Sequence, residues 1–179
     1  QHLLGLIDDV LDISAIEAGK RVLQKEKVDV KDLLDDCFRS FLPQAKENRI
    51  NISYTIADAV QHIYADLRSV KQIILNLVSN AVKFTENNGE IAVSVKKADE
   101  YTIIEVRDTG VGIPAETLLH ITEPFTQGHA NPMLSQKGYG LGLSIVKQLV
   151  MAHDGTVKLQ SEVGTGTTAI VVLPDGVPD

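Results

Sequence analysis

The chain has 179 residues, 44% hydrophobic and 23% charged, which suits one compact domain with an appended element rather than a disordered chain. Its 17 lysines and arginines against 24 aspartates and glutamates give a net charge of −7, which excludes a general nucleic-acid binder because nucleic-acid phosphates would be repelled. One cysteine excludes an internal disulfide, and no apolar run approaches the ~18 residues of a membrane span. We expect a soluble domain without membrane contact, cut from a longer protein because it begins at Gln1.

The first residues are expected to form a helix with one apolar face. Leucine, isoleucine and valine recur there at spacings of three and four, and Gly19 follows in the position where helices end. This helix is either an ordinary core helix or the stub of a helical bundle whose partners lie elsewhere. We interpret 1–19 as such a stub, 20–29 as a linker or strand, 30–174 as the main domain and 175–179 as a tail.

The main domain mixes helices and strands. Apolar spacing predicts long helices from Val30, over about 66–84 and over about 141–153, with a short one within 115–121. Period-two alternation predicts a strand over 50–56, and further strands are expected over 90–97, 101–107, 156–161 and 167–173. Cys37 lies in the apolar stripe of the first long helix, which predicts packing rather than reactivity. These elements indicate an α+β fold, a two-layer α/β sandwich in which three helices cover a mixed sheet of about five strands.

The helix over 66–84 carries a polar stripe beside its apolar one. Gln72, Asn76, Asn80 and Lys83 fall on one face. This stripe is either a solvated face or a ligand site, although each asparagine in a helix costs about 0.5 kcal/mol relative to good helix formers. Amide oxygens suit Mg²⁺ and a lysine suits phosphate, so the stripe is a candidate site for both.

A turn rich in glycine follows the strand over 101–107. Asp108 shares the parity of the buried residues of that strand, so its carboxylate lies on the apolar side and needs a donor. Gly110 and Gly112 leave room for a flat group, and the exocyclic amine of adenine would satisfy the carboxylate. The alternative is an aspartate turn that caps the short helix after Pro114. The Asp-Thr-Gly tripeptide also marks aspartic proteases, but long helices exclude their all-β fold.

A second glycine-rich segment leads into the helix over 141–153. Its glycines Gly138, Gly140 and Gly142 leave backbone N–H groups and the positive end of the helix dipole open to phosphate. The spacing matches neither a Walker loop nor a dinucleotide fingerprint. The stretch before it, from Asp108, is long for a loop in a compact domain, which is typical of a functional or disordered segment. Thr168, near the start of the last strand, has a hydroxyl that either reaches a pocket or finishes a turn.

Five segments in this order resemble the catalytic and ATP-binding domain of bacterial sensor histidine kinases. NLVSNAVKFT is similar to the N box, DTGVGIP to the first glycine box, EPFTQG to the F box, GYGLGLSIV to the second glycine box and GTGTTAIVVLP to the closing glycine segment. The first helix resembles the end of the second helix of the dimerisation and phosphoacceptor domain. The resemblance implies the Bergerat ATP-binding fold, which gyrase-type and chaperone ATPases share.

The resemblance also implies ATP and Mg²⁺ as cofactors and assigns residues to them. Asn76 and Asn80 would hold Mg²⁺ and, with Lys83, the phosphates as the catalytic set, and Asp108 would bind the adenine amine. The remaining cofactor-binding residues would be Gly110 and Gly112 at the base, Phe125 in the F box, Gly138, Gly140, Leu141 and Gly142 at the phosphates, and Thr168 behind the adenine. Residues 113–137 would form a lid that closes on the nucleotide.

The activity implied is transfer of the ATP γ-phosphoryl group to a histidine that this chain lacks, for relay to an aspartate of a response regulator. The implied partners are the protein's own dimerisation helices, in a homodimer, and that regulator; the expected location is the cytoplasm, whether or not the parent protein is membrane-anchored. The amide of Asn76 cannot serve as a general base, which fits phosphoryl transfer better than hydrolysis. The alternative is a degenerate kinase acting as a scaffold, because Thr122 and Tyr139 depart from the family pattern.

Overall fold

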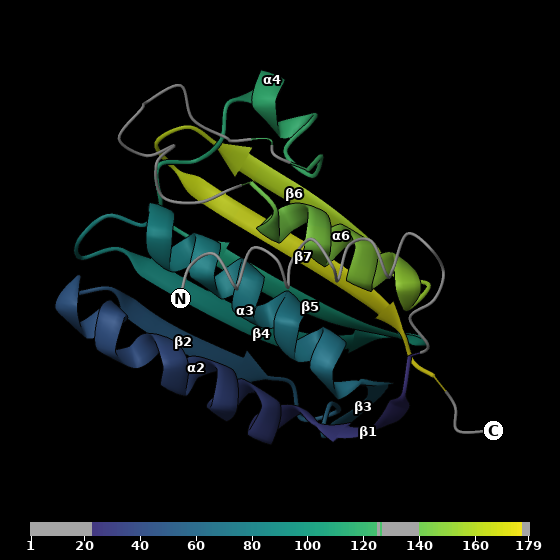
Figure 1. Ribbon diagram of the computed structural model, residues 1–179. Helices are drawn as coiled ribbons and strands as arrows, with labels where there is room; N and C mark the ends of the chain where they lie inside the picture. The colour runs from purple at the N-terminus through teal and green to yellow at the C-terminus, as the bar shows by residue number, and fades with distance from the viewer. Residues whose placement is uncertain (1–22, 125, 127–139, 177–179) are drawn as a thin grey trace, which may run out of the picture.

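The computed structural model describes residues 23–124, 126 and 140–176, in which a layer of helices lies on a main sheet and a small second sheet is present (Figure 1). The elements in chain order are β1 (Lys25–Asp29), α2 (Val30–Glu47), β2 (Asn51–Ile56), β3 (His62–Asp66), α3 (Leu67–Phe84), β4 (Glu90–Ala98), β5 (Tyr101–Asp108), α4 (Ala115–Leu118), α6 (Gly142–Ala152), β6 (Thr156–Glu162) and β7 (Gly166–Pro174). The helix predicted over 1–19 lies outside the described residues.

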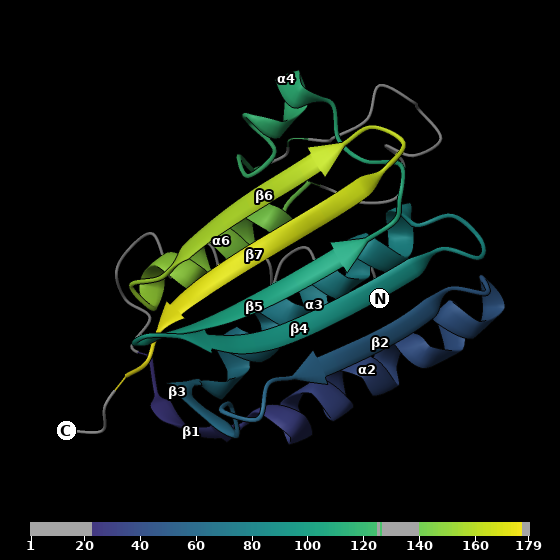
Figure 2. The same ribbon diagram turned by 180° about the vertical axis from the view of Figure 1, so that it is seen from behind.

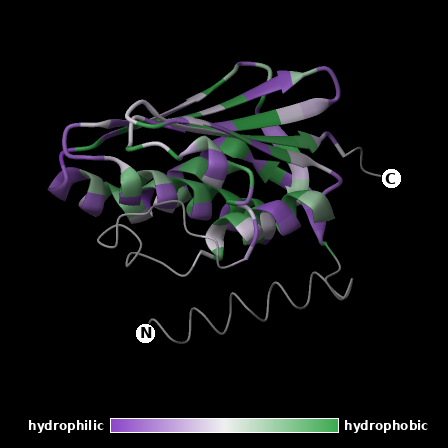
Figure 3. Cartoon of the chain, turned by 90° about the horizontal axis from the view of Figure 1, so that it is seen from above, coloured by the Kyte–Doolittle hydropathy of each residue, from purple (hydrophilic) through white to green (hydrophobic). Residues whose placement is uncertain are grey.

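The main sheet has five strands in the order β2-β4-β5-β7-β6. β2 runs parallel to β4, whereas every other neighbouring pair is antiparallel, so the sheet is mixed. Helices α2, α3 and α6 lie on one face of it (Figures 1 and 2), and the view from above shows the two layers (Figure 3). The predicted α+β sandwich of five strands under three helices is confirmed. Among the helices in the described part, none combines the length and apolar character that crossing a membrane requires.

Strand β3 was not predicted from the sequence. It has only five residues and pairs antiparallel with β1 in a separate two-stranded sheet. Val28 and Ile63 are opposite each other in this pair and both are buried, so β1 packs onto the core of the domain. The segment expected as a linker or strand over 20–29 therefore contains a strand whose partner the sequence pattern did not reveal.

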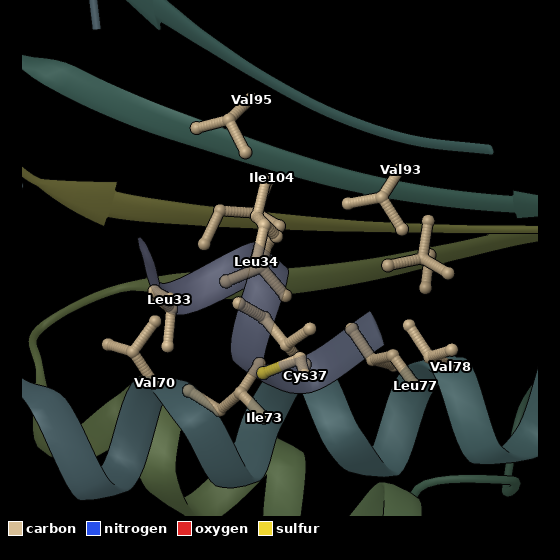
Figure 4. Close-up of a cluster of buried hydrophobic side chains, with 14 of the residues drawn as sticks. Leu33, Leu34, Cys37, Val70, Ile73, Leu77, Val78, Val93, Val95 and Ile104 are labelled. Atoms are coloured by element: carbon tan, nitrogen blue, oxygen red, sulfur yellow. The ribbon is translucent and has the colours of Figure 1, made fainter. Parts of the chain in front are cut away.

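The core lies between the helices and the sheet (Figure 4). Leu34 and Cys37 of α2, Ile73 of α3, and Val93 and Ile104 of the sheet are all buried there. Cys37 has no exposed surface, and burial raises the pKa of its thiol to about 11, so the predicted packing role is confirmed.

His153 joins the end of α6 to the start of α3. Its Nδ1 lies 2.8 Å from the Leu149 carbonyl oxygen, and the backbone N–H of Asp66 donates to its Nε2 over 3.2 Å. This arrangement requires a neutral ring, because a protonated ring has no acceptor nitrogen. The side chain is only 2% exposed, and this burial lowers the pKa of His153 below its ordinary value.

Acidification is expected to destabilise the domain through His153. The unfolded chain takes up a proton near pH 6.5, the ordinary value for histidine, whereas the folded ring resists protonation until the pH falls below its lowered pKa. The free energy of unfolding should therefore fall by up to about 1.4 kcal/mol per pH unit between those two values. Urea unfolding midpoints at a series of pH values would measure this. The same pH dependence in His153→Gln, whose amide does not titrate, would contradict the assignment.

Candidate functional site

The polar stripe of α3 contains a buried, unpartnered amide. The predicted apolar stripe is confirmed, since Val70, Ile74, Leu77, Val78 and Ala81 are all buried. Asn76 and Asn80 are half-buried beside it, and Nδ2 of Asn76 is buried without a hydrogen-bond partner among the described residues. Leaving such a donor unpaired costs about 1–3 kcal/mol, which a purely structural, solvated face would avoid. The amide therefore fits a ligand site better than a solvated face.

The start of α6 faces these asparagines. A Cβ placed on Gly142 would lie 3.7 Å from Asn76 Oδ1 and 3.7 Å from Asn80 Nδ2. Within the described part of the chain no side chain caps this end of α6, which leaves the positive end of its dipole as a favourable place for an anion. Figures 1 and 2 both show α3 and α6 side by side. The structure therefore brings Asn76, Asn80 and Gly142 together.

Three other residues predicted to bind the ligand lie near Asn80 in the sequence or just before α6. Gly140 has a φ of +72°, the left-handed region that favours glycine. Leu141 is 3% exposed and its side chain belongs to the core, so only its main chain remains for a ligand. The ammonium of Lys83 lies 4.4 Å from the centroid of the Phe84 ring, one turn beyond Asn80. Phe125 and Gly138 lie outside the described residues.

Asp108 ends β5 and organises the turn that follows. Its Oδ1 accepts the backbone N–H of Gly110 over 2.8 Å and that of Thr167 over 3.2 Å. Burial is the main cause that raises the pKa of this carboxyl, and the two hydrogen bonds act in the opposite direction. The alternative that Asp108 caps the short helix is wrong, because α4 begins after Pro114 with no side-chain cap.

The aspartate turn touches the end of the asparagine helix. The N–H of Val111 donates to the Phe84 carbonyl oxygen over 3.2 Å, and a Cβ on Gly110 would lie 2.5 Å from the same oxygen. Gly112, with a φ of +70°, packs on the other side against the backbone of Glu162. The turn is therefore wedged between α3 and the hairpin of β6 and β7, with no room for side chains on either glycine.

Thr168 is not brought to this site. Ala169 and Val171 are buried under the helices, so their parity places Thr167 on the helix side of β7 and Thr168 on the opposite face. The strand register agrees, because Thr167 pairs with Asp108 whereas Thr168 pairs with exposed Arg107. The prediction that Thr168 backs the ligand is corrected to Thr167. No signal in the sequence separates the two, because residues 169–173 are apolar at both parities.

A methyl group at Gly142 is expected to leave the stability of the domain unchanged and to weaken ligand binding. Gly142 is the first residue of α6, and 3.7 Å is an ordinary van der Waals distance, so Gly142→Ala should not lower the urea midpoint. The added methyl nevertheless lies beside the two asparagine amides, where phosphate oxygens would need to approach. Affinity for a triphosphate analogue should fall about tenfold, and undiminished affinity measured by calorimetry would contradict this placement.

These elements define a class of protein: a helix-on-sheet domain in which an aspartate turn and a glycine-started helix both contact the helix that carries two asparagines. Residues 65–177 match the family described as histidine kinase-, DNA gyrase B-, and HSP90-like ATPase, and the chain belongs to this family.

Within that family, the chain is similar to several histidine kinases. Histidine protein kinase DivJ of Caulobacter vibrioides is 38% identical over 173 residues, covering 97% of this chain and 29% of DivJ. The structure of full-length ShkA in complex with AMPPNP has a TM-score of 0.87 and 32% identity, covering 99% of this chain and 36% of that one. Histidine kinase ThkA in complex with response regulator protein TrrA shares the fold, with a TM-score of 0.76 at 24% identity over 98% of this chain and 48% of that one.

The comparisons confirm the resemblance found in the sequence: the chain is an ATP-binding catalytic domain of the histidine kinase type. The chain spans only part of its curated relatives: 21% of the length of one and 33% of the length of another.

Proposed function

We propose that this domain positions ATP, with Mg²⁺, and transfers its γ-phosphoryl group to a histidine on a dimerisation helix of the parent protein, for relay to a response-regulator aspartate. The observation that carries the proposal is that Asn76 and Asn80 face the start of α6 at Gly142, where, among the described residues, Asn76 Nδ2 is buried without a hydrogen-bond partner and α6 has no side-chain cap. A donor that is unpaired among the described residues, on a side chain that faces a helix start without a side-chain cap, favours a phosphate chain as the ligand.

The base and the phosphates have separate places in this proposal. Oδ1 of Asp108 is occupied by two backbone N–H groups, and in the described part no hydrogen bond is formed by Oδ2, which leaves it to accept the exocyclic amine of adenine. The asparagines, Lys83 and the start of α6 hold the phosphates. Because the Asp108 turn packs on the end of α3, one nucleotide can reach both places.

The residues present fit Mg²⁺ only together with a nucleotide. Among residues 23–124, 126 and 140–176, no group of three or more His, Cys, Asp or Glu could hold a metal ion. Mg²⁺ keeps several waters and binds substrate phosphates, so the amide oxygens of Asn76 and Asn80 would complete its shell. When bound, the ion neutralises charge on the phosphates.

Phosphoryl transfer fits these residues better than hydrolysis. The amide of Asn76 cannot take a proton from water, whereas transfer requires mainly positioning and neutralisation of charge. The acceptor is placed outside this chain because none of its five histidines stands in the H-E-x-x-x-P setting of the family's phosphoacceptor. The homodimer, the response regulator and the cytoplasmic location follow from the family relation and are part of this proposal.

The test is phosphorylation of the parent protein's dimerisation domain, supplied as a separate polypeptide, by this chain with γ-labelled ATP and Mg²⁺. We expect acid-labile, base-stable label on that domain, and Asn76→Asp should abolish it because a carboxylate repels phosphate. Asn87→Asp, an exposed turn residue, is the matched control and should retain transfer. Nucleotide binding without label would favour the scaffold alternative, and no binding at all would contradict both functions.

A further inference from the structure

Ser161 of β6 bonds to three different segments around Asp108. Its Oγ accepts the backbone N–H of Ile113 over 2.8 Å, lies 2.9 Å from the Gly166 carbonyl oxygen and lies 2.8 Å from Thr167 Oγ1. Ile113 immediately follows the glycine turn, and Gly166 and Thr167 begin β7. Ser161 and Thr167 are also direct partners in the strand register. No role in the proposed reaction has so far been given to this serine.

The number of protons on the Ser161 and Thr167 hydroxyls fixes which group donates in each of these hydrogen bonds. A serine hydroxyl has one proton and two acceptor lone pairs. The Gly166 carbonyl can only accept, so the bond to it takes the Ser161 proton. The Ile113 N–H occupies one lone pair of Ser161, and the other is left for the Thr167 hydroxyl, which must then donate. This is the arrangement that satisfies all three contacts at once.

The Thr167 hydroxyl is therefore left as an acceptor. The Thr167 hydroxyl donates its proton to Ser161, so it can offer only its lone pairs, as an acceptor, to a ligand. Thr167 is paired with Asp108 in the register and donates its backbone N–H to Asp108 Oδ1, so the two side chains share one face of the sheet. An ionised carboxylate is also only an acceptor. The two residues together present acceptors and no side-chain donor.

We propose that Ser161 is a positioning residue for base selectivity: by holding the Thr167 hydroxyl as an acceptor, it makes the site take a 6-amino purine and reject a 6-oxo purine. An exocyclic amine offers two N–H donors to these acceptors, whereas a carbonyl oxygen at the same place would face lone pairs on both residues. The inference rests on the proposed nucleotide-binding function and extends it to a residue outside the predicted set.

The test compares the dissociation constants of AMPPNP and its inosine counterpart by calorimetry. Wild type should prefer the adenine compound, and Ser161→Ala should reduce that preference about tenfold because the freed Thr167 proton can then be donated to a 6-oxo group. Ser161→Thr keeps the hydroxyl and should keep the preference. Ser94→Ala, the same change at a half-buried strand position on the opposite face of the sheet, is the matched control and should behave as wild type.

The outcomes separate the inference from the function on which it rests. Equal weakening of both compounds in Ser161→Ala would show a merely structural role and would overturn the inference while leaving nucleotide binding intact. Binding of neither compound by wild type would overturn the proposed function and the inference with it.

A second variant covers the case in which Ser161→Ala does not fold. Thr167→Val removes the hydroxyl with little change of shape and leaves the bonds of Ser161 to Ile113 and Gly166 in place. The preference for the adenine compound should again fall about tenfold, and the double variant should show no further loss. A wild-type preference in Thr167→Val would overturn the inference, and melting followed by circular dichroism would confirm that each variant is folded.

Discussion

Asp108→Asn is expected to reduce nucleotide affinity by at least about 100-fold without unfolding the domain. The asparagine oxygen must take the place of Oδ1, because the N–H groups of Gly110 and Thr167 both donate there. The amide nitrogen then occupies the position of Oδ2 and presents a donor to the donor amine of adenine. A charge-assisted bond is thus replaced by an opposed pair of donors.

Calorimetry with AMPPNP measures this effect, and a urea titration checks that the fold is kept. Asp58→Asn makes the same change at an exposed position in the turn after β2 and should bind as wild type does. Unchanged affinity in Asp108→Asn would show that the base does not lie at this carboxylate and would remove the main support for the orientation of the nucleotide.

Gly166→Ala is expected to have the largest effect on stability, a loss of about 3 kcal/mol or more in the free energy of unfolding. Its φ is +125°, a backbone conformation that side chains rarely adopt, and an added Cβ would overlap the Asp108 carbonyl oxygen. That oxygen belongs to the backbone at the end of β5, so the clash cannot be relieved by a rotamer change. The substitution would push β5 and β7 apart where Asp108 is held.

Gly164→Ala is the matched control for this prediction. Gly164 lies in the same hairpin with a φ of +80°, yet nothing lies within 4 Å of a Cβ placed on it. It should therefore lose only about 1 kcal/mol from the left-handed backbone conformation. Equal urea midpoints for the two variants would mean that the close approach to Asp108 is not what destabilises Gly166→Ala.

Much of the fold could be predicted because periodicity is strong in the long elements. The apolar stripes of α2 and α3 identified the buried faces of these helices, and β4 and β5 alternate clearly between buried and exposed residues. Strand β3 was not predicted because five residues are too few for period-two alternation to stand out. Its pairing with β1 is a contact between segments more than 30 residues apart, which local patterns do not reveal.

The site was predictable where a residue's role follows from its own neighbours in the chain. Asp108 could be placed by its parity in β5, and the asparagines by their spacing in α3. The choice between Thr167 and Thr168 could not be made from the GTGTT segment as it was read, because it depends on which face of β7 meets the helices. Leu141, which stands among the glycines, was predicted to bind the ligand, but its side chain is buried in the core.

Local periodicity and side-chain chemistry were enough to predict every long helix and every strand of the five-stranded sheet, the buried faces of the long helices and the residue types that suit a nucleotide. The packing of helices on the sheet was needed to show that Nδ2 of Asn76 is buried without a partner among the described residues, that Gly142 lies beside Asn76 and Asn80, and that Ser161 links Ile113 to Thr167. The physical reason is that an unsatisfied donor or a shared proton depends on atoms from several segments, and their distances are fixed only when the helices pack on the sheet.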